Sequence, residues 1–183
     1  DEQDRIQGTI PLPLNQAGKN NLKKIAALIE QEHPNVLYSS GNESSGTTAE
    51  YLAQLCRLKN KKYSALRELD CGLWQGLCIA EIKKRFAKGY KQWRKDPTSI
   101  CPPQGECVTN AGDRIYDALF HLHRKNRNKT VVLVAARIVC GLIECIITNN
   151  NFENLWQYVD DKNEMKIFNL RDQVKLKPIA MDV

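Results

Sequence analysis

The sequence predicts an α/β protein of three layers, in which helices cover both faces of a mostly parallel sheet. The segment Val131–Val134 is continuously apolar and mostly β-branched, which is typical of a strand buried on both faces. The segment 138–147 follows almost directly and is too apolar for a surface helix, and helical and strand-like patterns alternate along the rest of the chain. Ligands of such sheets bind beyond the carboxyl ends of the strands, so we expect a site at Ala135, Ala136 and Arg137.

The remaining elements are predicted from hydrophobic periodicity and from turn residues. In chain order they are a helix over 16–32, a strand over 36–38, a polar loop over 39–46, a helix over 49–58, a strand over 63–69, a helix over 78–88, a helix from about 110 to 125, the strand over 130–135, the helix over 138–148 and a terminal hairpin over 165–170 and 173–177.

Polar residues at the helix starts support these limits. Asn15 is a suitable N-cap for the first helix, whose apolar residues share one face. Thr47 or Thr48 would cap the second helix, and Thr109 or Asn110 the long helix that precedes the buried strand. The segment 96–107 contains three prolines and one glycine, so it is predicted to be an irregular loop, and long loops in compact domains are often functional.

The composition is that of an ordinary globular protein. The chain has 183 residues, of which 42% are hydrophobic and 26% charged, which fits one domain over residues 1–183. No apolar run reaches the roughly 20 residues that a membrane-spanning helix needs, so we expect no membrane association. The net charge of +6 comes mainly from basic runs at 59–62, 83–95 and 124–129. Aromatic residues are not interleaved there in a nucleic-acid-binding pattern, which favours solvated surfaces over nucleic acid as a partner.

The cysteines and histidines do not predict a metal site or a cofactor. The chain has seven cysteines and three histidines, without a Cys-x-x-Cys pair. His121 and His123 would lie about 200° apart around a helix, which is unsuitable for two ligands of one metal. Cys56, Cys140 and Cys145 have apolar neighbours and would pack as small hydrophobic side chains. We therefore expect reduced thiols, and with them a cytoplasmic location.

Several short motifs follow one another along the chain. They are Arg5-Ile6-Gln7-Gly8 with Pro11-Leu12-Pro13-Leu14, Leu37-Tyr38-Ser39-Ser40 with Thr48-Ala49-Glu50, the stretch Leu66–Gly76, Pro103-Gln104-Gly105-Glu106 and the strand Val131–Val139. In this order they resemble the histidine phosphatase superfamily, in its cofactor-dependent phosphoglycerate mutase branch. The resemblance implies a phosphoglycerate mutase-like fold and a reaction in which a histidine accepts a phosphoryl group.

The resemblance also implies a site for a phosphorylated small molecule or another anion. Glu68 matches the carboxylate that the family uses as a proton donor, although an ordinary ion-paired loop carboxylate explains it equally well. The residues expected at the substrate or phosphate are Arg5, Gln7, Gly8, Ser44 and Arg137.

Departures from the family pattern predict a loss of activity. Ala136 stands where the family has its second histidine, and Ser44 where it has a phosphate-binding arginine. A serine hydroxyl lacks the charge and the planar fork of a guanidinium, and losing one such stabilising group costs about 10²–10³ in rate. The family's first strand, which carries its nucleophilic histidine, would precede Asp1 and lie beside 131–135, so we expect an additional strand or a substitute there. The favoured interpretation is a pseudoenzyme, and the alternative is an active phosphomonoester hydrolase or phosphomutase whose histidine lies upstream of the numbered chain.

Overall fold

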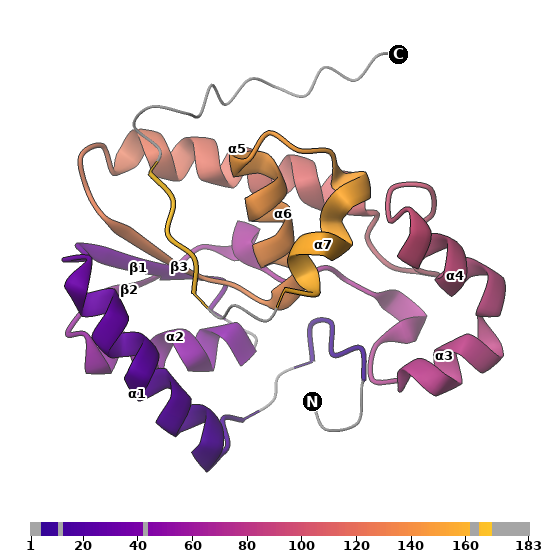
Figure 1. The fold of residues 1–183 in the computed structure, drawn as a ribbon, viewed down its shortest axis with the longest axis horizontal. Coiled ribbons are helices and arrows are strands. Elements are labelled where there is room, and N and C mark those ends of the chain that lie inside the picture. The colour runs from indigo at the N-terminus through magenta and orange to yellow at the C-terminus, as the bar shows by residue number, and fades with distance from the viewer. Residues whose placement is uncertain (1–4, 11–12, 42–43, 162–164, 170–183) are drawn as a thin grey trace.

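The computed structural model describes residues 5–10, 13–41, 44–161 and 165–169 and confirms an α/β fold of three layers (Figure 1). Its sheet has three parallel strands in the order β2-β1-β3. The strands are β1 (Val36–Ser39), β2 (Asn60–Lys62) and β3 (Val131–Val134). The helices are α1 (Gln16–Gln31), α2 (Ser44–Leu55), α3 (Ile79–Arg85), α4 (Ala87–Lys95), α5 (Val108–Lys125), α6 (Arg137–Ile147) and α7 (Leu155–Val159). Short 3₁₀ turns are formed by Ser64–Leu66, Gly72–Trp74 and Phe152–Asn154.

Successive side chains along each strand point to opposite faces of the sheet, so the core is divided between the two faces. Leu37 points to the face covered by α1 and α2, where Val132 and Val134 also pack. Val36 and Tyr38 point to the opposite face, which α5 and α6 cover. Each parallel connection therefore places a helix on the sheet, as the alternating pattern in the sequence predicts.

Several predicted elements are confirmed. Asn15 caps α1, because its side chain accepts a hydrogen bond of 2.8 Å from the amide of Gly18. α6 begins and ends within one residue of its predicted limits, and seven of its residues are buried. No helix within the described ranges is both long enough and apolar enough to cross a membrane.

The region from residue 44 to 69 differs from the prediction. α2 begins at Ser44 and not near Ala49, because Gly46 lets the first turn pack directly on Gly41, where a Cβ would lie 2.8 Å from the Gly41 carbonyl carbon. The predicted strand over 63–69 is also wrong. The strand is Asn60–Lys62, an edge strand whose basic residues reach solvent, and a 3₁₀ turn follows Tyr63.

Other differences concern the second half of the chain. The predicted helix over 78–88 ends at Arg85, and a second helix, α4, begins at Ala87, because Phe86 leaves the helical conformation (φ −130°, ψ 35°). α5 begins at Val108, one or two residues before its predicted caps. β3 is only partly buried, since within the described residues it pairs with β1 alone and forms the edge of the sheet.

The predicted terminal hairpin receives no support from the part of it that is described. The segment 165–169 contains no strand, and the rest of the hairpin lies outside the described residues.

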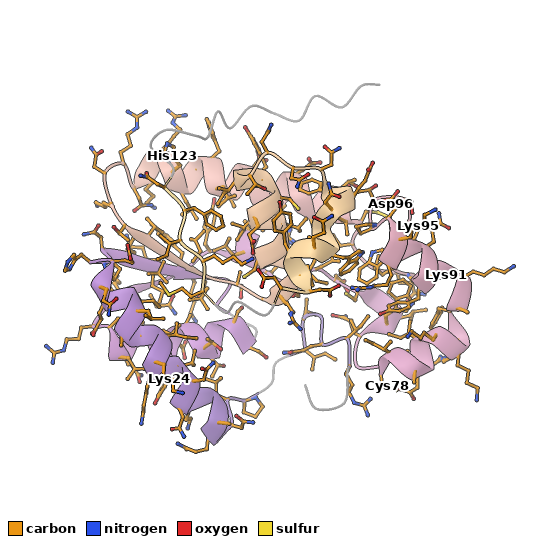
Figure 2. The ribbon with its side chains drawn as sticks, viewed as in Figure 1. Lys24, Cys78, Lys91, Lys95, Asp96 and His123 are labelled. Atoms are coloured by element: carbon orange, nitrogen blue, oxygen red, sulfur yellow. A yellow bond between two sulfur atoms is a disulfide. The ribbon has the colours of Figure 1, made fainter. Side chains whose placement is uncertain are left out.

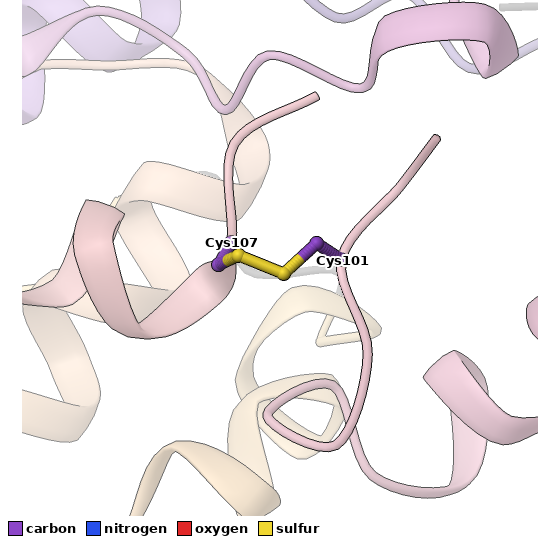
Figure 3. The surroundings of a disulfide bond; sticks show 2 residues. All are labelled: Cys101 and Cys107. Atoms are coloured by element: carbon purple, nitrogen blue, oxygen red, sulfur yellow. A yellow bond between two sulfur atoms is a disulfide. The ribbon is translucent and has the colours of Figure 1, made fainter. Parts of the chain in front are cut away.

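The cysteines depart from the expectation of reduced thiols at one pair. Cys101 and Cys107 form a disulfide that closes the loop before α5 (Figure 3). The pair is six residues apart, and in the chain-entropy description closing a loop of this size stabilises the fold by about 2 kcal/mol. Cys56, Cys71, Cys78, Cys140 and Cys145 are free thiols. Because disulfides persist mainly in oxidising compartments, the cytoplasmic location stays a prediction.

Candidate functional site

The carboxyl ends of β1 and β3 lie side by side and define the candidate site. Ser39 is in register with Val134, so Ser40 and Ala135, the residues that follow, leave the sheet together. Ser39 and Ser40 are buried. A buried polar group at the end of a parallel strand is placed where ligands of α/β sheets bind.

A group of hydroxyls lies between the end of β1 and the start of α2. The hydroxyls of Ser40 and Ser45 are hydrogen-bonded at 2.9 Å and both residues are buried. Gln7 donates from Nε2 to the hydroxyl of Ser44 and to the carbonyl of Ile10. Two residues predicted for the site, Gln7 and Ser44, are therefore in direct contact although they are far apart in the sequence.

Glu68 lies on the β3 side of the site and is 5% exposed. Its Oε2 accepts a hydrogen bond of 3.2 Å from the amide of Ile138, in the first turn of α6, and its Oε1 accepts one of 2.8 Å from the amide of Leu69. A carboxylate is favoured there because it faces the positive end of the helix. Glu68 is thus more than a solvated loop carboxylate, since it joins the 64–69 segment to the end of β3.

A network of two arginines holds the segment that carries Glu68. Arg114, on α5, donates to both carboxylate oxygens of Glu106 and to the carbonyls of Ala65 and Arg67. Arg67 donates to the same carboxylate at 3.0 Å. The side chains of Arg114 and Glu106 are 15% and 12% exposed, so this ion pair is largely desolvated. Arg114 therefore fixes the backbone on either side of Leu66, two residues before Glu68.

The loops on this side of the molecule are locked together by close backbone contacts. Gly72 has φ +50°, and a Cβ there would lie 2.2 Å from the carbonyl oxygen of Pro103. The amide of Glu106 donates to the carbonyl of Asp70 at 2.8 Å. The loop that the disulfide closes is thus attached to the loop that follows Glu68.

The N-terminal segment contributes two further predicted residues, Arg5 and Gly8. Arg5 donates to the carbonyl of Gly76 at 2.9 Å and lies 3.9 Å from the carboxylate of Glu81, so it is directed toward the start of α3. Gly8 has φ +55°, and a Cβ there would lie 2.1 Å from Oε1 of Gln75, the oxygen that accepts from Thr9. Both residues therefore hold the segment that presents Gln7.

Of the three residues that directly follow β3, Ala135, Ala136 and Arg137, only Arg137 has a polar side chain. Ala136 is the N-cap of α6 and no side chain caps this helix. Arg137, the first residue of α6, is exposed, and within the described residues no ion pair or side-chain hydrogen bond engages its guanidinium. The carboxylate of Glu68 is hydrogen-bonded to the first turn of α6 but forms no ion pair with Arg137 among the described residues, so the exposed guanidinium is a candidate ligand for a further anion.

The thiols near Glu68 stay protonated at neutral pH. Burial, with smaller contributions from Glu68 and Glu144, raises the pKa of Cys140 to about 11. Burial, together with the neighbouring carboxylates, likewise raises the pKa of Cys71 well above its ordinary value. Since the thiolate is the nucleophilic form, neither cysteine is suited to replace a missing nucleophile.

Two of the three histidines lie away from the carboxyl ends of the strands, and the third, His121, contacts the residue that follows β2. His33 is exposed between α1 and β1, at the amino end of the strand. His121 and His123 are exposed on α5, where His121 stacks on Tyr63 and His123 projects from the outer surface in Figure 2. Within the described ranges, no group of three or more His, Cys, Asp or Glu residues is arranged to hold a metal ion.

Comparison with known proteins identifies the family. A model of the histidine phosphatase superfamily (branch 1) matches residues 1–175. The chain belongs to the histidine phosphatase superfamily. Among curated relatives, phosphoserine phosphatase 1 of Hydrogenobacter thermophilus is 23% identical over 92% of this chain and 80% of its own length. The 2,3-bisphosphoglycerate-dependent phosphoglycerate mutase of Bartonella bacilliformis is 33% identical over 65% of this chain, which spans 57% of that protein.

Solved structures support the phosphoglycerate mutase-like histidine phosphatase fold. The protein YhfR of Bacillus stearothermophilus superimposes with a TM-score of 0.79 at 21% identity, over 85% of this chain and 77% of that one. At this identity the likeness concerns the fold alone. The relatives thus confirm the predicted fold and family, whereas the roles of individual residues rest on the geometry above.

Sequence reasoning missed part of the candidate site. It did not single out Ser40, Ser45 or Arg114, although Ser40 ends the motif that follows β1 and could have been found as a polar residue beyond a strand end. Arg114 carries no such indication, because a single arginine on an amphipathic helix is usually exposed.

Proposed function

We propose that this chain is a histidine phosphatase family member that lacks key catalytic residues, binds a phosphorylated small molecule or another anion, and turns it over little. The observation that carries the proposal is the end of β3, where Ala136 offers no functional group and Arg137 offers a cation without a partner among the described residues. The methyl side chain of Ala136 argues against phosphoryl transfer, and the guanidinium of Arg137 favours anion binding.

Anion binding is supported by the charges and donors at this end of the sheet. The first turn of α6 has no side-chain cap, and Glu68 is hydrogen-bonded to one of its amides, that of Ile138. An anion beside Arg137 would meet the guanidinium and the positive end of α6 together. The Ser44 hydroxyl, held by Gln7, is a neutral donor on the opposite side of the site.

Low turnover is supported by the chemistry of the same residues. Phosphoryl transfer needs an activated nucleophile and cations that stabilise the phosphoryl oxygens. Among the described residues, the side chains at the site that could act as nucleophiles are serine hydroxyls and protonated thiols. His33 lies at the amino end of β1 and His123 projects from the outer surface, while His121 stacks on Tyr63, the residue after β2. An active phosphomonoester hydrolase or phosphomutase would need a histidine from outside the numbered chain, a possibility that the names of the relatives and the position of Glu68 favour.

Replacing Arg137 by glutamine is expected to weaken the binding of inorganic phosphate about tenfold or more, since hydrogen bonds to charged groups contribute about 1.5–3 kcal/mol. The measurement is a titration followed through backbone amide resonances, with those of Ile138 and Val139 as reporters. Arg124→Gln, an exposed change on α5, is the matched control and should leave the affinity unchanged. Equal affinities for Arg137→Gln and the unsubstituted protein would contradict anion binding at α6.

A further inference from the structure

A pocket lies between α3, α4 and the disulfide-closed loop, and none of the residues proposed for the β3 site lines it. Its volume is about 380 Å³, within the range of small-molecule sites. Trp74, Phe86 and Ile100 supply apolar walls, while Lys84 and Lys88 are cations from the two helices. No carboxylate lines the pocket among the described residues. This combination of walls and charge suits a molecule with an apolar body and an anionic head.

The pocket also contains the start of α4. Ala87, Lys88 and Gly89 line it, and they form the first turn of a helix of nine residues. No side chain caps this helix, whose N-cap is Phe86. The amides of a first helical turn have no intrahelical acceptor and carry a partial positive charge, so they favour an anion placed against them.

The indole of Trp74 is an independent indication of a ligand. Trp74 is fully buried, yet its Nε1 has no hydrogen-bond partner within the described residues. A methyl group on Gly89 would lie 4.0 Å from Cζ2 of this indole, a carbon next to the one bonded to Nε1. The side of the ring that carries Cζ2 therefore faces Gly89, which lines the pocket together with Trp74. A buried donor without an acceptor costs about 1–3 kcal/mol, which an acceptor on a ligand would recover.

The neighbouring tryptophans allow a comparison within one aromatic cluster. Trp93 packs against both Trp74 and Trp156, with ring centroids 5.1 Å and 4.5 Å apart. Trp156 donates from Nε1 to the carbonyl of Trp93 at 2.9 Å. Nε1 of Trp93 is also without an acceptor, but Trp93 does not line the pocket. Trp74 alone combines an unsatisfied indole with a place in the pocket wall.

We infer that this pocket binds a small amphipathic anion, an aromatic or similar apolar body that carries one phosphate-like or carboxylate headgroup. The apolar body packs between Phe86 and Ile100, and the headgroup accepts from Trp74 Nε1 and the first turn of α4. Lys84, Arg85 and Lys88 provide the positive potential at the rim. Three cations of the basic run 83–95, which the candidate site at β3 does not use, thereby acquire a role.

Phenylphosphonate is a suitable probe, because its carbon–phosphorus bond resists hydrolysis by phosphatases. Titration is followed through the three indole N–H resonances, which Trp74→Phe and Trp93→Phe assign. We expect a saturable downfield shift of the Trp74 resonance, with smaller shifts for Trp93 and Trp156. Methylphosphonate lacks the ring and should bind about tenfold more weakly, because it loses the burial of apolar surface. Benzyl alcohol lacks the charge and should also bind about tenfold more weakly, because it loses a charged hydrogen bond.

Substitutions separate this pocket from the site at β3. The pair Lys84→Ser and Lys88→Ser should weaken phenylphosphonate binding about tenfold or more. Lys91→Ser, which removes a cation pointing away from α4 in Figure 2, should have no effect, and neither should Arg137→Gln. An unshifted Trp74 resonance, or equal binding by the Lys84/Lys88 variant, would overturn the inference. A loss of binding in Arg137→Gln would overturn it as well, because the probe would then occupy the β3 site.

Discussion

Replacing Arg114 by methionine is expected to lower the free energy of unfolding by about 3 kcal/mol. The side chain makes two hydrogen bonds to Glu106 and two to backbone carbonyls, and it is 15% exposed. Removing one partner of a largely buried ion pair costs about 3–5 kcal/mol, because the other charge stays desolvated. The lower end of this range applies here, since Arg67 still pairs with Glu106.

The measurement is urea unfolding, with thermal unfolding as a second probe. In a chain of this size 3 kcal/mol corresponds to a shift in Tm on the order of 10 °C. Arg124→Met, which removes an exposed arginine from the same helix, should change the free energy by less than about 0.5 kcal/mol. If the two variants were equally stable, Arg114 would not hold the segment that carries Glu68.

Replacing Glu68 by glutamine is expected to have two opposite effects. Stability should fall by about 1–3 kcal/mol, because the carboxylate accepts from two backbone amides and a glutamine side chain has only one oxygen to offer. Binding of inorganic phosphate should become several-fold tighter, because a negative charge beside the first turn of α6 is removed. If the role of Glu68 were purely structural, its replacement would lower both the stability and the phosphate affinity, or would lower the stability alone.

The control for Glu68→Gln is Glu50→Gln, an exposed change on α2 that should alter neither the stability nor the phosphate affinity. Stability is measured by urea unfolding and affinity by the amide titration described above. Weaker phosphate binding in Glu68→Gln would contradict the placement of the anion next to this carboxylate.

The sequence predicts much of the architecture where an element is determined by residues close together in the chain. The apolar run at β3, the helix that follows it and the Asn15 cap are confirmed nearly to the residue. The strand at 60–62 was not predicted, since three polar residues of an edge strand carry no apolar pattern. The early start of α2 depends on the contact between Gly46 and Gly41, which short-range periodicity does not encode.

The site is less predictable than the fold, because its groups meet only in three dimensions. The family resemblance points to Gln7, Ser44 and Glu68, and the place after the buried strand points to Arg137. The structure places Gln7 against Ser44 and Glu68 against the first turn of α6. It does not bring Arg5 to the same point, since Gly76 and Glu81 engage its guanidinium. The arginine network depends on contacts between residues far apart in the chain, and the Cys101–Cys107 disulfide depends on the path of the loop before α5. Neither has a counterpart in the predicted site.

The central claim is that this family member binds an anion at the end of β3 without turning it over. The most direct test is the rate of p-nitrophenyl phosphate hydrolysis by the purified protein, compared with buffer and with Glu68→Gln. We expect a rate indistinguishable from that of the buffer for both proteins, while the phosphate titration still reports binding. Hydrolysis well above the buffer rate that disappears in Glu68→Gln would contradict the claim and show that this carboxylate serves an active phosphatase.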